Sequence, residues 1–407
     1  MKKVFLGLTL LAALVISQAA KAQMNPIITS MPSLSIAPDA RSGGMGDVGA
    51  ATAPDLNSQH WNPAKYAFMD SHGGITGNYT PWLTKLVNDI NLAYIAGYYT
   101  ISEMAGTLSA SFTYFSLGKV QLTDLNGTFL ADAHPNEWAI DLAYSRKLHE
   151  YVSMAVALRF MYSDLNNGAN ASTIGATEMY PGMTAAADVA LYYRQPIEIG
   201  SGTSYFGLGL NISNLGGKIS YDQNVTQSFI PANLRLGLSY EIPFDKYNSL
   251  TINADFNKYL VPTRNNKFAV DGNGNPLTGE SLTNWYSGVS SPRGWFMSFA
   301  DAPGYYDDIK KKQISPAVEE LQEIQFGIGA EYSYDKKFFA RAGYSHEARW
   351  KGNRRYATVG AGFHLSIFSL DVAYVIATAP SNPLDNTLRF TLGFDLAGIK
   401  DLVNNKK

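Results

Sequence analysis

Hydrophobic and polar side chains alternate without a break over residues 386–396, near the end of the chain. The apolar positions are Leu388, Phe390, Leu392, Phe394 and Leu396, and the positions between them hold Thr387, Arg389, Thr391, Gly393 and Asp395. Because successive side chains of a strand point to opposite faces, this segment has one apolar face and one polar face. The pattern predicts a β-strand that lies between an apolar phase and water.

The same alternation recurs along the chain and predicts about 14 strands. It is regular in residues 103–118, 150–165, 231–243 and 248–262, where large apolar residues alternate with small, polar or charged ones. Most of the segments reach the ~9–11 residues that cross a bilayer at a tilt, and exceed the roughly 5–6 residues of an ordinary strand. Strands are expected at residues 72–81, 89–101, 103–118, 135–148, 150–165, 181–194, 203–214, 231–243, 248–262, 322–334, 337–347, 354–365, 368–378 and 386–396.

The connections between these segments alternate between short and long. The short ones are residues 101–103, 149–150, 245–248, 335–336 and 366–367, and the long ones are 119–134, 166–180, 215–230, 263–321, 348–353 and 379–385. A membrane barrel with periplasmic turns and external loops has this alternation. An even number of strands also predicts that both chain ends lie on the periplasmic side. The link 195–202 departs from the pattern, because it is long for a tight turn.

A soluble β-sandwich is the alternative explanation for the alternating segments. In lipid, however, every backbone polar group must be paired within the protein, which favours a closed sheet without edges. The length of the segments fits a bilayer better than a sandwich. We therefore expect an all-β fold, a transmembrane antiparallel β-barrel, formed by residues 72–396.

The start of the chain has the features of a secretory signal peptide. Met1-Lys2-Lys3 is basic, residues 4–16 are apolar, and Ala20-Lys21-Ala22 is a small-residue cleavage site. Residues 1–22 are therefore expected to be removed; a buried N-terminal helix is the alternative. No later segment supplies the roughly 18–20 continuous apolar residues of a membrane-spanning helix. Residues 397–407 form a short polar tail.

The composition agrees with an outer-membrane barrel. Aromatic residues make up 13% of the chain, with 25 Tyr and 20 Phe, and 16% of residues are charged. The charged fraction is below the ~25% of soluble domains, and aromatic girdles are typical of such barrels. A net charge of −2 argues against a nucleic-acid partner. With no cysteine, disulfides, zinc–thiolate sites and thiol catalysis are excluded.

The residues that could carry chemistry form no recognisable catalytic or metal-binding motif. The six histidines lack zinc-site spacing, and neither a G-x-S-x-G elbow nor a Walker loop occurs. Residues 43–46, Gly-Gly-Met-Gly, lack the strand and helix of a phosphate loop, and Glu319-Glu320 is interpreted as solvated loop charge. His364 and Ser366 share a strand face but are expected to pack in the lumen. We expect no enzyme activity, no cofactor and no metal.

The segment before the first strand contains a glycine-rich motif followed by Asn-Pro-Ala. Residues 35–50 read SIAPDARSGGMGDVGA, and residues 57–65 read NSQHWNPAK. These motifs resemble the FadL family of outer-membrane barrels, which have an N-terminal hatch in the lumen and often carry hydrophobic compounds. About 35 residues are closer still to the PorV family, also called LptO, of type IX secretion in Bacteroidota. The hatch would comprise residues 23–71, with the motif residues Arg41, Gly43, Gly44, Gly46, Asn62, Pro63 and Ala64.

The resemblance to the PorV family implies a function in protein secretion. Its members bind the C-terminal signal domain of exported cargo, associate with a SprA- or Sov-like translocon barrel, and deliver cargo to a PorU-, PorZ- and PorQ-like attachment complex. An integral protein in outer-membrane lipid that acts by binding is the expectation. A FadL-like transporter of fatty acids or other hydrophobic compounds is the alternative. A part in lipid A deacylation, associated with the name LptO, would be indirect.

Charged residues on the inward strand faces are candidates for holding the hatch. Buried charges need partners, so we expect pairs with the hatch or with one another. The alternative is that residues 24–71 form a mobile periplasmic tail. The candidates are Arg159, Arg235, Arg341, Arg389, Asp141, Asp255, Asp371 and Asp395.

The link at residues 263–321 is far longer than ordinary connections of about 4–6 residues. Its aromatic residues either contact a partner or fold the loop back on itself; the sequence favours neither over the other. Residues 316–321 are expected to form a short helix. The candidate partner-contact residues are Trp285, Tyr286, Trp295, Phe296, Phe299, Tyr305 and Tyr306.

Overall fold

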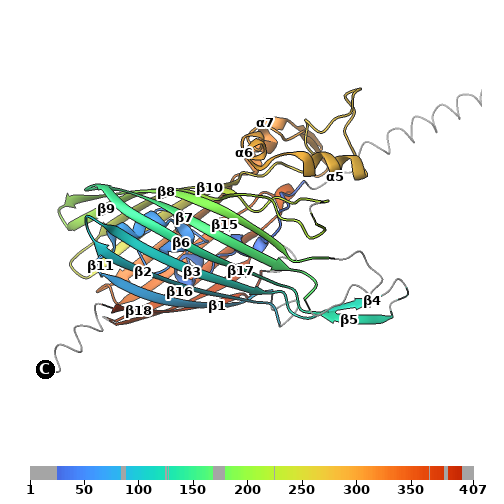
Figure 1. Cartoon of the computed structure of the whole chain (residues 1–407). Coiled ribbons are helices and arrows are strands. Elements are labelled where there is room, and N and C mark those ends of the chain that lie inside the picture. The colour runs from blue at the N-terminus through green and yellow to red at the C-terminus, as the bar shows by residue number, and fades with distance from the viewer. Residues whose placement is uncertain are drawn as a thin grey trace, which may run out of the picture.

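The computed structural model describes residues 25–83, 89–123, 126, 128–167, 179–223, 225–365, 367–379 and 384–396. Its main element is a closed barrel of 14 antiparallel strands, in which neighbours follow chain order and β1 closes against β18 (Figure 1). The barrel strands are β1 Gly73–Pro81, β2 Asn91–Ser102, β3 Gly106–Ser116, β6 Asn136–His149, β7 Val152–Asp164, β8 Gly182–Ile199, β9 Gly202–Gly216, β10 Asn233–Pro243, β11 Asn248–Tyr259, β14 Gln325–Tyr334, β15 Phe338–His346, β16 Arg355–His364, β17 Phe368–Ala377 and β18 Leu388–Asp395.

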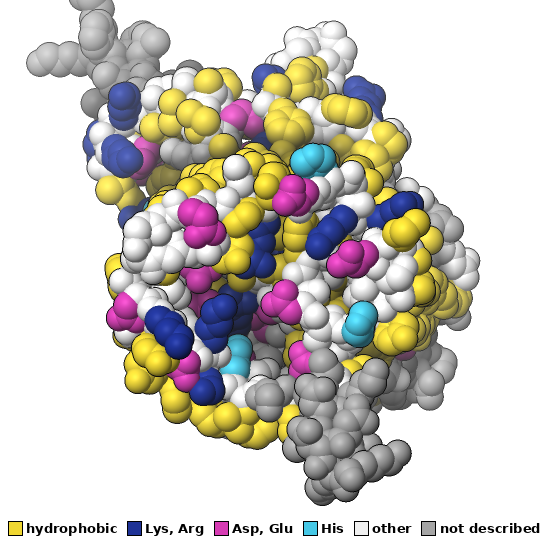
Figure 2. All heavy atoms as spheres, turned by 90° about the vertical axis from the view of Figure 1, so that its left-hand side faces the viewer, with side chains coloured by type: hydrophobic (Ala, Val, Ile, Leu, Met, Phe, Trp, Pro, Cys, Tyr) yellow, Lys and Arg dark blue, Asp and Glu magenta, His cyan; other side chains and the backbone are white. Residues whose placement is uncertain are grey.

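The two faces of the strands differ as the alternation predicts. In β18, Leu388, Phe390, Leu392 and Phe394 are exposed on the outside, whereas Arg389 and Thr391 are buried in the lumen. An end-on view shows hydrophobic side chains around the outside and charged ones gathered at the mouth of the barrel (Figure 2). An apolar outside and a polar inside are the arrangement that lipid on one side and water or polar protein on the other require.

The fold class and the strand pattern predicted from the sequence are confirmed. All of the expected segments form barrel strands, with ends displaced by a few residues. One departure is corrected: β8 continues to Ile199 and β9 begins at Gly202, so residues 195–202 do not form a long link. The short connections then all lie at one end of the barrel, here called the turn end, and the long ones lie at the opposite loop end.

Three of the long links contain structure that the alternation did not predict. Residues 117–135 carry a hairpin of β4 Val120–Thr123 and β5 Phe129–Ala133. The 263–321 link and the residues after it form a small helical cap at the loop end (Figure 1). The elements of this cap are α5 Gly279–Gly288, α6 Ser291–Met297, β12 Tyr305–Asp307, β13 Lys312–Ile314 and α7 Pro316–Gln322, and a further link carries η3 Arg349–Lys351. The helix expected at residues 316–321 is therefore confirmed as α7.

The N-terminal segment runs through the lumen and fills it, so it is not a mobile tail. Its helix α2 packs against β16, β17 and β18 on one side of the barrel, and η2 packs against β3, β6, β7 and β8 on the other. This hatch appears as the blue ribbon within the strands (Figure 1). Its short helices are η1 Pro32–Ser35, α2 Ala40–Gly43, α3 Ser58–Trp61 and η2 Pro63–Phe68.

The prediction that both chain ends lie on one side is wrong for the described chain. The Asn25 amide donates to the Trp350 carbonyl at 3.2 Å, and its side chain donates to Glu319 at 3.1 Å, both at the loop end. The last barrel strand, β18, finishes at the turn end, beside the start of β1. An even strand count shows only that the first strand begins and the last strand ends on the same side. The hatch runs through the lumen, so the chain before β1 starts at the opposite end of the barrel.

None of the helices in the described part of the chain has the length and apolar character needed to cross a membrane. The predicted signal peptide at residues 1–22 and the predicted tail at residues 397–407 lie outside the described residues.

A lysine at the centre of the outer face is expected to destabilise the barrel according to its depth. Leu158 is 65% exposed in the middle of β7, so Leu158→Lys should lower the free energy of unfolding in lipid vesicles by about 2–4 kcal/mol. Leu148 is 60% exposed near the turn end of β6, and Leu148→Lys should cost about 0–1 kcal/mol. Urea titration followed by tryptophan fluorescence measures both. Equal costs for the two variants would contradict a lipid-facing band.

Candidate functional site

Arg41 is the central cation of the hatch. It lies in α2, where its guanidinium contacts Asp55 of the hatch at 2.8 Å and Glu331 of β14 at 2.8 Å. Glu331 also accepts from Arg341 at 2.6 Å, and Arg341 reaches Asp371 at 2.6 Å. A buried charge needs opposite charges and hydrogen bonds around it, and this chain of alternating signs supplies them across three strands. The pairs therefore fasten the hatch to the barrel.

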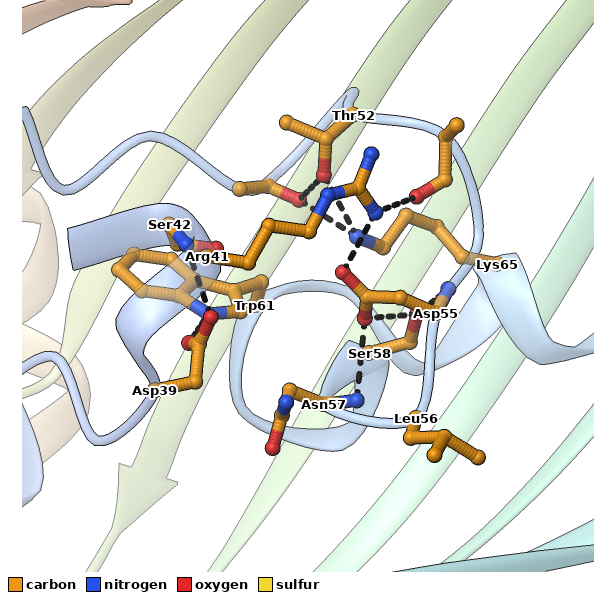
Figure 3. A network of polar contacts seen from close by, with 12 residues as sticks. Asp39, Arg41, Ser42, Thr52, Asp55, Leu56, Asn57, Ser58, Trp61 and Lys65 are labelled. Atoms are coloured by element: carbon orange, nitrogen blue, oxygen red, sulfur yellow. Dashed lines mark hydrogen bonds and ion pairs between the residues drawn. The ribbon is translucent and has the colours of Figure 1, made fainter. Parts of the chain in front are cut away.

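Further polar contacts fix the fold of the hatch itself (Figure 3). The Asp39 carboxylate caps α2 by accepting from the Ser42 amide at 2.8 Å, and it accepts from the Trp61 indole at 2.6 Å. The Lys65 ammonium group donates to the Gly49 carbonyl at 2.8 Å and to Thr52 at 2.9 Å. These contacts join residues from both halves of the hatch, so its short helices and the loops between them form one compact plug.

The glycines of the motif allow the hatch backbone to touch the barrel backbone. Gly46 has a φ of +77°, and a Cβ added there would lie 2.7 Å from the Tyr344 amide nitrogen. On the barrel side, a Cβ on Gly343 would overlap the backbone of Met45. Gly43 lies against the Arg389 side chain, and Gly44 lies against the Gly360 backbone. Only glycine combines a left-handed conformation with so close an approach.

The Asn-Pro-Ala part of the motif makes a second fastening. The Asn62 side chain donates to the carbonyls of Ala50 and Leu191, each at 3.0 Å, and accepts from the Ala64 amide at 3.1 Å. Pro63 begins η2, where the missing amide hydrogen costs nothing. The Ala64 carbonyl in turn accepts from Ser153 of β7 at 2.7 Å. The motif thus ties the second half of the hatch to β7 and β8.

Most of the predicted lumen charges are paired, as expected. Arg159 contacts Asp141 and, at 3.0 Å, Asp188. Arg389 reaches Asp47 of the hatch at 2.6 Å.

Asp255 accepts from the hatch amides of Gly49 at 2.8 Å and Ala50 at 3.0 Å, with Arg235 at 3.8 Å. Asp371 also contacts His364 at 3.1 Å, which agrees with lumen packing for this histidine; Ser366 lies outside the described residues. Asp395 is half-buried at the turn end, opposite Gly74. Asp47, Asp55, Asp188 and Glu331 were not singled out by the sequence analysis, because an ion pair between distant segments leaves no local signal.

Among the described residues, two mainly polar cavities lie between the hatch and the barrel wall. They share Ser35, Ile36, Arg235, Asn257, Tyr259 and Gln325 in their lining. The guanidinium of Arg235 lies over the Trp61 ring at 4.4 Å, which holds it in place between the cavities. A lumen with this lining suits water and ions better than hydrocarbon.

Three of the seven candidate contact aromatics pack within the protein. Trp285, Tyr286 and Trp295 surround a buried apolar cluster formed by Phe229, Ala232, Leu260, Val261 and Val289. The Tyr286 hydroxyl donates to the Pro262 carbonyl at 2.9 Å, and burial raises the pKa of Tyr286. For these residues the structure shows self-packing, which holds the cap on the loop end.

Lys218 also fastens the cap. It donates to the carbonyls of Tyr286 at 3.0 Å and Ser287 at 2.9 Å, and its ammonium lies 4.2 Å from the Phe229 ring centre. Burial without an opposite charge lowers the pKa of Lys218 to about 8.

Three other candidates are exposed on the cap. Phe296 is 80% exposed and Phe299 is 51% exposed, and Tyr306 is exposed nearby in sequence on β12. Tyr305 is partly buried, with its ring 5.6 Å from the Trp350 ring and its hydroxyl 2.8 Å from Gln322. Large exposed aromatics on a folded surface are typical of binding sites.

Comparison with known proteins identifies the family. A family model described as type IX secretion system protein PorV matches residues 18–266, which is more than half of the chain. The chain belongs to the PorV family. The match includes the hatch and nine barrel strands, from β1 to β11, whereas the wall residues Glu331, Arg341 and Arg389 lie beyond it. No curated protein sequence matches the chain significantly.

Solved structures show the fold that this PorV-family chain shares with other barrels. A TodX ΔS2S3 mutant, described as a monoaromatic hydrocarbon channel, superposes with a TM-score of 0.50 at 11% identity, covering 88% of this chain and 98% of that one. The toluene transporter TodX of Pseudomonas putida gives 0.46 at 11%, covering 91% and 98%. A Pseudomonas aeruginosa FadL homologue gives 0.41 at 11%, covering 91% and 99%. At such identity the likeness establishes only a FadL-like barrel fold.

Removing the shared carboxylate of the hatch network should destabilise the protein. Glu331→Gln leaves Arg41 and Arg341 with a neutral partner in a buried site, and we expect a loss of about 3 kcal/mol in the free energy of unfolding. Chemical denaturation in detergent measures it.

The matched control is Asp335→Asn, which breaks the exposed pair with Lys337 and should leave the denaturation midpoint unchanged. If Glu331→Gln has the same denaturation midpoint as the unmodified protein, the network does not fasten the hatch.

Proposed function

We propose that this PorV-family protein is the cargo adaptor of a type IX secretion system in the outer membrane. It binds the C-terminal signal domain of exported cargo and carries cargo from the translocon to the attachment complex at the cell surface. The family match carries this proposal, and the exposed aromatic surface of the cap supports it. The protein acts through binding and not through catalysis.

The cap supplies a suitable contact surface. Phe296 lies in α6 beside the packed Trp295, and Phe299 lies in the turn after this helix, where its amide donates to the Phe296 carbonyl at 3.4 Å. Binding to a preorganised aromatic surface loses less conformational entropy than binding to a flexible segment. The exposed Leu321 of α7 adds apolar area to the cap. We therefore assign the cargo contact to the cap.

The filled lumen supports an adaptor over a conduit for protein. The hatch bridges the barrel from β14 to β7 and β8 through buried ion pairs and hydrogen bonds. A passage wide enough for a polypeptide would require all of these contacts to break together. Cargo is therefore proposed to cross the membrane through a separate SprA- or Sov-like translocon barrel. This protein then carries the cargo to a PorU-, PorZ- and PorQ-like attachment complex.

Transport of fatty acids or other hydrophobic compounds is the second candidate function, which the FadL-like fold favours. It would use the two cavities beside the hatch. Their lining by Arg235, Asn257 and Gln325 suits a hydrocarbon chain poorly, and for this reason we place cargo binding first.

Truncating the two exposed aromatics should weaken cargo binding. The variant Phe296→Ala with Phe299→Ala removes two side chains that we assign as hot spots, whose truncation costs more than about 1 kcal/mol each, so the Kd for an isolated cargo C-terminal domain should rise about tenfold or more. Binding to the purified protein in nanodiscs measures this, and surface display of cargo in cells should fall with it.

Phe129→Ala is the matched control, because Phe129 is an exposed aromatic of a different loop, on β5. It should leave the Kd unchanged. Normal binding by the double variant would remove the cap from the mechanism, and tight binding of a fatty acid by the same protein would favour the transport function.

The proposed orientation places the long loops, and with them Asn25, outside the cell. The chain has no cysteine, so single cysteines report topology cleanly. Ile28→Cys, exposed at the loop end, should react with a membrane-impermeant maleimide on intact cells, and Lys246→Cys, exposed in a turn, should react only after lysis. The opposite labelling pattern would reverse the assigned orientation.

A further inference from the structure

Three carboxylates meet at the base of the cap, where it joins the barrel. Asp301 follows α6, Glu320 belongs to α7, and Glu323 follows α7 directly. Each offers one carboxylate oxygen, and the three oxygens lie within 4.8 Å of one another. The sequence analysis interpreted Glu319-Glu320 as solvated charge, and this is wrong: Glu319 and Glu323 are buried, and Glu320 is largely covered. Lys258 of β11 and Lys351 of η3 contact these carboxylates and help to cover them.

The hydrogen bonds of the cluster leave oxygens without a donor. Asp301 is 0% exposed; its Oδ2 accepts from the Thr263 amide at 3.0 Å and from Asn266 at 2.7 Å, whereas its Oδ1 has no hydrogen-bond partner. The Oε1 of Glu320 accepts from the Ala302 amide at 2.7 Å, and its Oε2 has no hydrogen-bond partner. A buried acceptor left in this state is costly, so its retention indicates a ligand.

The site has two more negative than positive groups, which is the charge that a divalent cation would balance. Four carboxylates, those of Asp301, Glu319, Glu320 and Glu323, surround two ammonium groups. Lys258 lies 2.5 Å from Glu323 and 3.6 Å from Glu320, and Lys351 lies 2.7 Å from Glu319 and 2.9 Å from Glu323. When all six groups are ionised, two negative charges remain uncompensated.

We propose that Asp301, Glu320 and Glu323 bind a divalent cation, and that this cation is Ca²⁺. The ligands are all hard oxygens, which excludes a preference for zinc or copper. Ca²⁺ accepts six to eight oxygens in flexible geometry, and waters complete its coordination, whereas Mg²⁺ demands a regular octahedron. The two lysines reduce the attraction, so the affinity belongs in the range of about 10⁻⁴–10⁻³ M that is typical of extracellular sites.

The three proposed ligands come from two segments of the cap, the link after α6 and the end of α7. Bound Ca²⁺ would join the link after α6 to α7, two residues beyond Phe299, and would stiffen the exposed aromatic surface of the cap.

The test uses the full chain, purified in detergent and freed of metal with a chelator. Adding Ca²⁺ up to about 10 mM, at least tenfold above the expected Kd, should raise the unfolding temperature, and titration calorimetry should show one site. Mg²⁺ at the same concentration should have a clearly smaller effect. Asp301→Asn should weaken Ca²⁺ binding at least tenfold.

Glu280→Gln is the matched control, since Glu280 is an exposed carboxylate of the same loop on α5, and it should keep the full response. If Asp301→Asn fails to fold, Glu320→Gln, which removes a partly exposed ligand, replaces it. An unmodified protein that does not respond to Ca²⁺, or a response that persists in both ligand variants, would refute the site. Cargo binding plays no part in these measurements, so the outcome is independent of the proposed adaptor function.

Discussion

The closure of the sheet by pairing β1 with β18 is the constraint on which the rest of the structure depends. A backbone polar group exposed to lipid has no partner, so a sheet that spans a bilayer must be without edges. Closure creates an inside as well as an outside. On the outside, the apolar side chains of each alternating strand face the lipid. The inside must be filled, and the hatch fills it with charge and polar backbone, which would be too costly if left unpaired.

Pairing across the lumen explains why the hatch and the wall carry charges of both signs. Arg41 and Asp47 belong to the hatch, and their partners Glu331 and Arg389 belong to the wall. Each group satisfies a partner from a distant part of the chain, so the removal of one leaves an uncompensated charge in a buried site. The cap differs from the lumen, because apolar packing by Trp285 and Trp295 holds it together. At its base, two carboxylate oxygens have no hydrogen-bond donor.

The sequence predicted the barrel well because the alternation is a local signal repeated in every strand. It also indicated Arg159, Arg341 and Arg389 as inward charges, since strand facing follows from position alone. It did not find Glu331 as the shared partner of Arg41 and Arg341, because this pairing depends on the packing of the hatch against β14. For the cap aromatics, the composition was equally compatible with partner contact and with self-packing. Only the structure shows that Trp285 packs inside the cap whereas Phe296 is exposed.

The hatch also organises the seam of the barrel. The Ala40 amide donates to Thr391 of β18 at 2.8 Å, and Asn78 of β1 donates to Asn57 of the hatch at 2.8 Å. Thr391 and Asn78 bond to each other at 2.6 Å, so one polar chain runs from the hatch through both closing strands. The first and last strands are the farthest apart in sequence, and their pairing carries the largest loop-closure entropy. A hatch that contacts both strands holds them near each other and reduces this cost, so the plug contributes to the closure of the sheet.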